Sequence, residues 1–145
     1  MSAQLWRSTI VLERIFCIFA VACAAIALLG SPRAFADDAA QTTAAVNRGK
    51  ILFLQCRACH EVTIGAPHRV GPNLHGMMNR KAGTTEGYTY SSSMVDSGLI
   101  WDVATLDRWL ERPGAVVSGT TMAFAGIASA ADRAALISYL TQATR

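Results

Sequence analysis

Two cysteines separated by two residues and followed directly by a histidine, Cys56-Arg-Ala-Cys59-His60, constrain this chain more than any other feature. Thiols at this spacing can form thioethers with the two vinyl groups of one haem, and the adjacent histidine then lies under the iron. This is the pattern of c-type haem attachment. It predicts one covalently bound haem c, which cannot dissociate from a small protein rich in loops.

Other uses of the cysteine pair fit less well. A redox-active dithiol of the thioredoxin type expects a preceding strand and a βαβ context, which the sequence lacks. A zinc site with His68 and His75 would have the spacing Cys-x2-Cys-x8-His-x6-His, which does not match the usual finger spacings. A structural disulfide remains open, but it gives His60 no role.

The N-terminus has the features of a secretory signal peptide. Arg7 and Arg14 precede an uncharged apolar run over residues 15–29, and an A-x-A site ends at Ala36. We predict that residues 1–36 are removed by cleavage after Ala36, which leaves 109 residues, enough for one small domain in the periplasm. An uncleaved leader would instead tether the domain to the membrane, although fifteen apolar residues are short for a span.

The charge of the remaining chain excludes one class of partner. Ten basic and nine acidic side chains follow residue 36, so the net charge is +1, against +3 for the whole chain. A charge this small without a basic run predicts no binding to nucleic acid.

Three helices are predicted after the leader. The first begins near Ala44, where apolar residues recur at three- and four-residue steps, and runs into the cysteine pair. The second has Asp102 as its N-cap and ends at Pro113. The third follows Ser129, where Ser129-Ala-Ala-Asp132 resembles a capping box with Asp in place of Glu. No alternating strand pattern is present, so the fold class is all-α.

Long irregular segments join these helices, over residues 61–93 and 114–127, and residues 37–43 are predicted to form a flexible N-terminus. Three short helices bury little core, and ordering so many loop residues is entropically unfavourable. A large, rigid, apolar cofactor at the centre would supply the missing buried apolar surface, and a haem is such a cofactor.

Met122 is the candidate for the second iron ligand. It lies in the second irregular segment, within Gly119-Thr-Thr-Met122-Ala-Phe124 and 62 residues after His60. A loop can carry its thioether to the open face of the iron. Ligation by histidine and methionine raises the reduction potential and suits electron transfer.

Several motifs, in matching order and spacing, resemble the class I cytochrome c family, that is, mitochondrial cytochrome c and its soluble bacterial relatives. The resemblance implies a small class I cytochrome c fold over residues 44–145, with three to five helices and long loops wrapped around one haem. The motifs include CRACH at 56–60, VGPNLHG at 70–76, GYTYS at 87–91, GTTMAFAGI at 119–127 and LISYL at 136–140.

The resemblance implies a role for each matching residue. His60 and Met122 would be the axial ligands, Cys56 and Cys59 the thioether anchors, and His68 a structural bridge between loops.

It also implies roles for residues around the cofactor. Pro72 would accept a hydrogen bond from the second ring nitrogen of the ligand histidine and fix its tautomer. Tyr90 and Trp101 would donate to a buried haem propionate, with Arg80 nearby and Thr120 assisting, because an unpaired buried carboxylate is costly.

Two departures from the family pattern stand out. Many relatives carry lysines around the exposed haem edge, and their absence here predicts weak electrostatic steering of partners. Trp109 and Met94 stand where the family often has tyrosine and asparagine, which makes the interior near the iron less polar. Uncharged residues occupy the positions that match those lysines: Gln55, Gly114, Ala115 and Thr121.

The sequence therefore predicts a periplasmic one-electron carrier rather than an enzyme. Its expected partners are redox proteins (a membrane cytochrome complex, an oxidase or a periplasmic dehydrogenase), which a monomer would meet in transient complexes. The alternative is a haem enzyme or sensor, a peroxidase or gas binder, acting through a labile Met122. The absence of an obvious acid–base group in the sequence beside Met122 counts against it.

Overall fold

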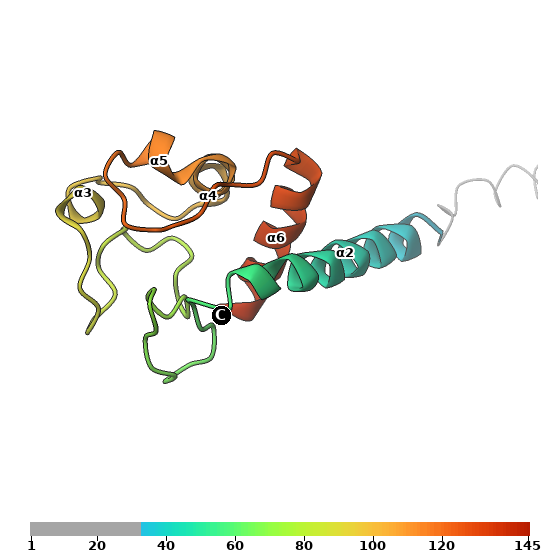
Figure 1. Ribbon diagram of the computed structural model, residues 1–145. Coiled ribbons are helices and arrows are strands. Elements are labelled where there is room, and N and C mark those ends of the chain that lie inside the picture. Colours follow the sequence, from blue (N-terminus) through green and yellow to red (C-terminus); the bar gives the residue numbers. More distant parts are fainter. Residues whose placement is uncertain (1–32) are drawn as a thin grey trace, which may run out of the picture. The chain divides into compact units, whose positions relative to one another are not determined.

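The computed structural model describes residues 33–145, so the predicted signal peptide lies almost entirely outside the described residues and its boundaries stay predictions. The chain divides after Asp38, and Ala39–Arg145 form one compact unit. Within the described residues there are helices and long loops but no strand, which confirms the all-α prediction (Figure 1). The helices are α2 (Arg33–Leu52), the 3-10 turn η1 (Phe53–Gln55), α3 (Ser92–Val95), α4 (Val103–Glu111), α5 (Pro113–Val116) and α6 (Ala130–Ala143).

Helix α2 begins earlier than predicted. It starts at Arg33 and runs through residues 37–43, which were predicted to be flexible. Residues 39–44 are exposed, so the alanine-rich sequence itself, rather than tertiary packing, favours helix there. No helix within residues 33–145 is long and apolar enough to cross a membrane.

The predicted caps of α4 and α6 are confirmed. The Asp102 carboxylate accepts a hydrogen bond from the N–H of Thr105 at 2.7 Å, and the Ser129 hydroxyl accepts one from the N–H of Asp132 at 3.2 Å. The Asp132 carboxylate does not turn back to complete a capping box. It binds the guanidinium of Arg48 at 2.8 Å and thereby links α6 to α2.

Pro113 ends α4 as predicted and also begins a short helix that was not predicted. Helix α4 stops at Glu111, and α5 has Pro113 in its first turn, where the missing N–H leaves no intrahelical bond unmade. The short helix α3 was likewise not predicted; Ser91 caps it by accepting from the N–H of Met94 at 3.3 Å.

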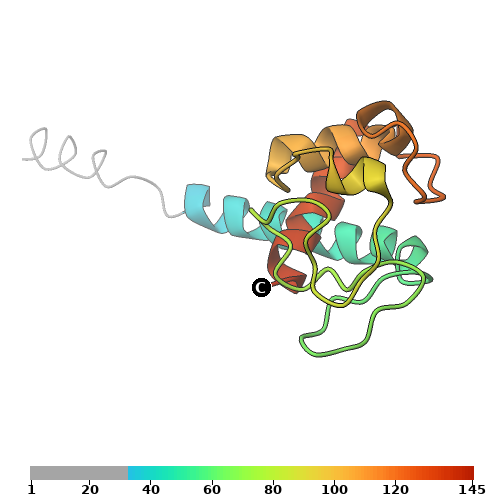
Figure 2. The ribbon, with the colours of Figure 1, turned by 90° about the vertical axis from the view of Figure 1, so that its left-hand side faces the viewer.

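The C-terminal part of α2 and helix α6 cross in close contact (Figure 2). A Cβ on Gly49 would overlap the carbonyl of Ala135 and lie 2.7 Å from the Cβ of Tyr139, so only glycine fits at this point. Beside it, the rings of Phe53 and Tyr139 lie 5.3 Å apart. This crossing holds the segment that follows α2 against the core.

The buried core lies between α4, α6 and the loops. Leu136 and Phe53 are fully buried, and Leu106 and Trp109 of α4 pack into the same cluster. The long loop after His60 is tied back to the cysteine segment, because Gly71 N–H donates to the Cys59 carbonyl at 2.8 Å.

Candidate functional site

A cavity of about 250 Å³ opens between the turn that follows α2, the loop at residues 70–90, α4 and the irregular segment at residues 118–129. Its lining is mainly apolar. The fold thus brings residues from both halves of the domain to one place. All nine residues predicted for the site line this cavity: Cys56, Cys59, His60, Pro72, Arg80, Tyr90, Trp101, Thr120 and Met122.

One wall of the cavity is a helical turn that continues from η1. The N–H groups of Cys59 and His60 both donate to the Cys56 carbonyl, at 3.0 and 2.9 Å. Because these residues are three and four positions after Cys56, their side chains fall on the same side of the turn. The two thiols are not joined by a disulfide. Burial, reinforced by Cys59, raises the pKa of the Cys56 thiol to about 11, so this sulfur is uncharged at neutral pH.

His60 is held in one orientation. Its Nδ1 lies 2.8 Å from the carbonyl oxygen of Pro72, and a carbonyl can only accept, so Nδ1 carries the proton. Gly71 packs on the ring, and a Cβ there would lie 2.8 Å from Nδ1. Burial lowers the pKa of His60, an effect that the Pro72 hydrogen bond opposes. A neutral ring with Nε2 as its unprotonated nitrogen can serve as a metal ligand.

The segment that carries Met122 lines the cavity as well. Met122 is half-buried, and its N–H donates to the hydroxyl oxygen of Thr120 at 3.3 Å. Phe124 N–H then donates to the Met122 carbonyl at 3.0 Å, so the chain turns tightly around the methionine. No titratable side chain occurs in residues 118–126.

Arg80, Tyr90 and Trp101 lie around the same cavity. Arg80 and Trp101 are neighbours, because Trp101 N–H donates to the Arg80 carbonyl at 3.0 Å. The Arg80 guanidinium donates to the His75 carbonyl at 3.1 Å. The Tyr90 hydroxyl and the Trp101 indole N–H have no hydrogen-bond acceptor within residues 39–145, so both donors remain available to a group in the cavity.

Comparison with known proteins identifies the family of this arrangement. The family model described as cytochrome c matches residues 46–144. The chain is 46% identical over 94 residues to a cytochrome c2 of Rhodoblastus acidophilus, covering 65% of this chain and 88% of the relative. It is 45% identical over 95 residues to a cytochrome c of Ginkgo biloba (66% and 84%) and 42% identical over 94 residues to a cytochrome c-550 of Bradyrhizobium diazoefficiens (65% and 69%).

The chain belongs to the cytochrome c family. Its function is that of a one-electron carrier, and its cofactor is one covalently bound haem c. The cavity of this cytochrome c fits such a group on three counts. Two thiols and an oriented imidazole lie on one helical turn, a thioether lies on a separate segment, and ring donors without protein acceptors lie between apolar walls.

Tyr88 also lines the cavity, although no role was predicted for it. Its hydroxyl donates to the Val70 carbonyl at 2.6 Å, and its ring lies edge-on to Tyr90 with centroids 4.7 Å apart. It therefore fixes the orientation of Tyr90 and closes the loop at residue 70. The only sequence signal is the two-residue spacing of the tyrosines within GYTYS, which an extended segment places on one side.

His68 bridges two loops, as the resemblance implies. Its Nδ1 accepts from the N–H of Asn73 at 3.0 Å, and its Nε2 then carries the proton donated to the Glu86 carbonyl at 2.8 Å. With both ring nitrogens engaged, His68 is not available for the zinc alternative. Among the described residues, no group of three or more histidines, cysteines or acidic residues is placed to hold a metal ion.

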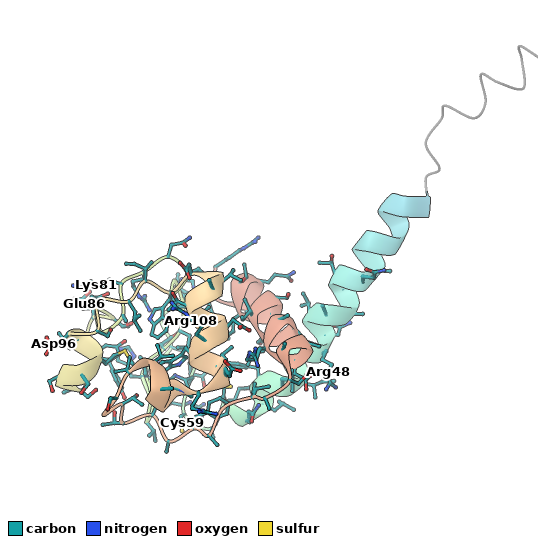
Figure 3. The ribbon with its side chains drawn as sticks, turned by 90° about the horizontal axis from the view of Figure 1, so that it is seen from above. Arg48, Cys59, Lys81, Glu86, Asp96 and Arg108 are labelled. Atoms are coloured by element: carbon teal, nitrogen blue, oxygen red, sulfur yellow. The ribbon has the colours of Figure 1, made fainter. Side chains whose placement is uncertain are left out.

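The exposed residues at the mouth of the cavity are uncharged, and among the residues that line it only Arg80, which is half-buried, carries a fixed charge. The exposed residues that line its mouth include Gln55, Val70 and Thr121, all uncharged. Figure 3 shows Lys81 and Asp96 at the end of the domain that carries α3, apart from Cys59.

Proposed function

We propose that His60 and Met122 are the axial ligands of the haem iron and that Cys56 and Cys59 carry the two thioethers. The observation that supports this most directly is that a single cavity is lined by all four side chains. When bound, the haem supplies a reversible one-electron change between ferric and ferrous iron. The protein would hold the cofactor from both sides of the cavity, and the mainly apolar lining would shield it from water.

The other predicted residues act on the cofactor's surroundings. Pro72 holds His60 in the tautomer whose Nε2 lone pair is available as a ligand. Tyr90 and Trp101 are the donors for a buried propionate, and Arg80, beside Trp101, supplies positive charge there. The Thr120 hydroxyl can make two hydrogen bonds. Its oxygen accepts from the N–H of Met122, and its proton remains available to a propionate.

We further propose that the chain is not an enzyme. Peroxide or gas chemistry would need an open iron position and a nearby acid–base group, and no carboxylate lines the cavity. Its partners are other redox proteins, namely a membrane cytochrome complex, an oxidase or a periplasmic dehydrogenase. They dock transiently on the uncharged rim, and nucleic acid is not among them.

The proposed location is the periplasm. It rests on the signal peptide proposed for residues 1–36, with cleavage after Ala36, ahead of a cytochrome c domain at residues 44–145. Sequencing the N-terminus of the native protein tests this directly. A start at Asp37 supports an exported, released domain, whereas an intact leader supports a membrane-tethered one.

A visible spectrum of the purified protein in both redox states, with a pyridine haemochrome assay, tests the cofactor assignment. We expect haem c that acid-acetone does not extract, and a weak long-wavelength charge-transfer band typical of ferric iron bound by thioether sulfur. The variant Met122→Ala should lose this band and gain rapid carbon monoxide binding. Retention of the band in Met122→Ala would overturn the ligand assignment, and rapid carbon monoxide binding by the wild type would favour the enzyme or sensor.

A further inference from the structure

Arg133, on α6, is the only buried charged residue among residues 39–145. Its guanidinium holds the Asp107 carboxylate of α4 with two bonds, from Nε at 2.8 Å and from one terminal nitrogen at 3.3 Å. The other terminal nitrogen donates to two backbone carbonyls, those of Ile127 at 3.0 Å and Ala128 at 2.9 Å. All three guanidinium nitrogens are therefore engaged.

Those two carbonyls belong to the segment that carries Met122, in which Gly126 also packs closely on the Glu111 carbonyl of α4. Residues 118–129 contain no helix, and the bonds of Met122 and Phe124 are internal to the segment. One backbone bond joins the segment to α4, from Ile127 N–H to the Leu110 carbonyl at 2.8 Å. Arg133 binds the carbonyl of that same residue, five positions after Met122.

We propose that Arg133 is a positioning residue for Met122: it clamps the end of the methionine segment to α4 and so holds the thioether over the cavity. This inference rests on the proposed ligation by His60 and Met122. The clamp couples the packing of α4 against α6 to the strength of the sulfur–iron bond.

Arginine suits this position because a planar fork of donors can bind a carboxylate and two carbonyls at once. Lysine would keep the charge but has a single nitrogen. It cannot hold Asp107 and both carbonyls in the same geometry. The carbonyls of Ile127 and Ala128 would then lose a hydrogen-bond donor from α6, which loosens the segment at its C-terminal end.

Displacement of Met122 by added imidazole measures how firmly the thioether is held. In the ferric holoprotein, Arg133→Lys should lower the apparent Kd for imidazole about tenfold and lower the reduction potential. Asp107→Asn, which keeps Arg133 but weakens its anchor, should lower the Kd by a smaller factor. Arg48→Lys is the matched control, because Arg48 also binds an acidic residue, Asp132 of α6, 58% of its side chain is exposed, and these bonds do not reach residues 118–129.

Three outcomes decide the matter. A lower imidazole Kd in Arg133→Lys and Asp107→Asn, with Arg48→Lys within about twofold of the wild type, supports the clamp. An unchanged Kd in Arg133→Lys, together with a lower urea midpoint, overturns it and leaves Arg133 a purely structural residue. A wild type without the sulfur–iron charge-transfer band refutes the ligation by Met122 itself, which is a separate failure.

Discussion

Nδ1 of His60 and the carbonyl oxygen of Pro72 lie 2.8 Å apart. The residue before Pro72, Gly71, packs directly on the imidazole ring. His60 is thus held by a hydrogen bond to Pro72 and by a packing contact with Gly71. The contact has no spare room, because a methyl group at residue 71 would overlap the ring. The orientation of the imidazole therefore depends on a residue that carries no side chain.

Replacing Gly71 with alanine should displace His60. The ring or the loop must move, which weakens the Pro72 hydrogen bond and lowers the free energy of unfolding by about 2 kcal/mol. Urea unfolding and the reduction potential of the holoprotein measure the two effects. Gly114→Ala is the control, because a Cβ at Gly114 meets nothing within 4 Å. Equal behaviour of the two variants would contradict the prediction.

A methyl group added where α2 and α6 cross should destabilise the protein at least as much as Gly71→Ala. Gly49→Ala places a methyl group against the backbone of Ala135, and we expect a loss of about 3 kcal/mol in the free energy of unfolding. Asn47→Ala, on an exposed position of the same helix, should change it by less than about 0.5 kcal/mol. A Gly49→Ala protein as stable as Asn47→Ala would show that the helices separate without loss.

Electron transfer should depend only weakly on salt. The exposed rim of the cavity carries no charged side chain, so the rate constant for oxidation by hexacyanoferrate(III), a small anion, should fall shallowly with ionic strength. Thr121→Lys should steepen this dependence. Gln142→Lys adds the same charge on α6, away from the cavity, and should steepen it less. A steep dependence in the wild type would rule out an uncharged rim as the contact surface.

Acid should weaken the Asp107–Arg133 pair. The hydrogen bond from Arg133, together with its charge, holds the pKa of Asp107 below its ordinary value of 3.8. A depressed pKa in the folded state gives stability that is present above the unfolded pKa and lost as the pH falls through the folded one. The wild type should therefore exceed Asp107→Asn in stability at pH 7, and the difference should shrink below about pH 4. Urea unfolding over this pH range checks it, and a constant difference would contradict it.

Local signals in the sequence predicted the local parts of this structure. The haem motif, the caps at Asp102 and Ser129, and the end of α4 at Pro113 depend on residues a few positions apart. The resemblance to a family then predicted which distant residues share the cavity.

The features that were not predicted from the sequence escaped for different reasons. Helices α3 and α5 each span four residues, too few to show a hydrophobic period. The early start of α2 reflects alanine-rich composition rather than amphipathicity. The bonds from Arg133 to the carbonyls of Ile127 and Ala128 involve backbone atoms, which no side-chain pattern reports.

The cysteine–histidine turn at residues 56–60 also bears on how the molecule matures. The two cysteines and the histidine are neighbours in sequence, so a newly made, still unfolded polypeptide can already present all three side chains to a haem. The thioether at Met122 reaches the cavity only after a loop of 62 residues has closed. A haem attached at this stage would then be the centre around which the rest of the chain folds. Because its bonds to the cysteines are covalent, it would remain attached whenever the protein later unfolds.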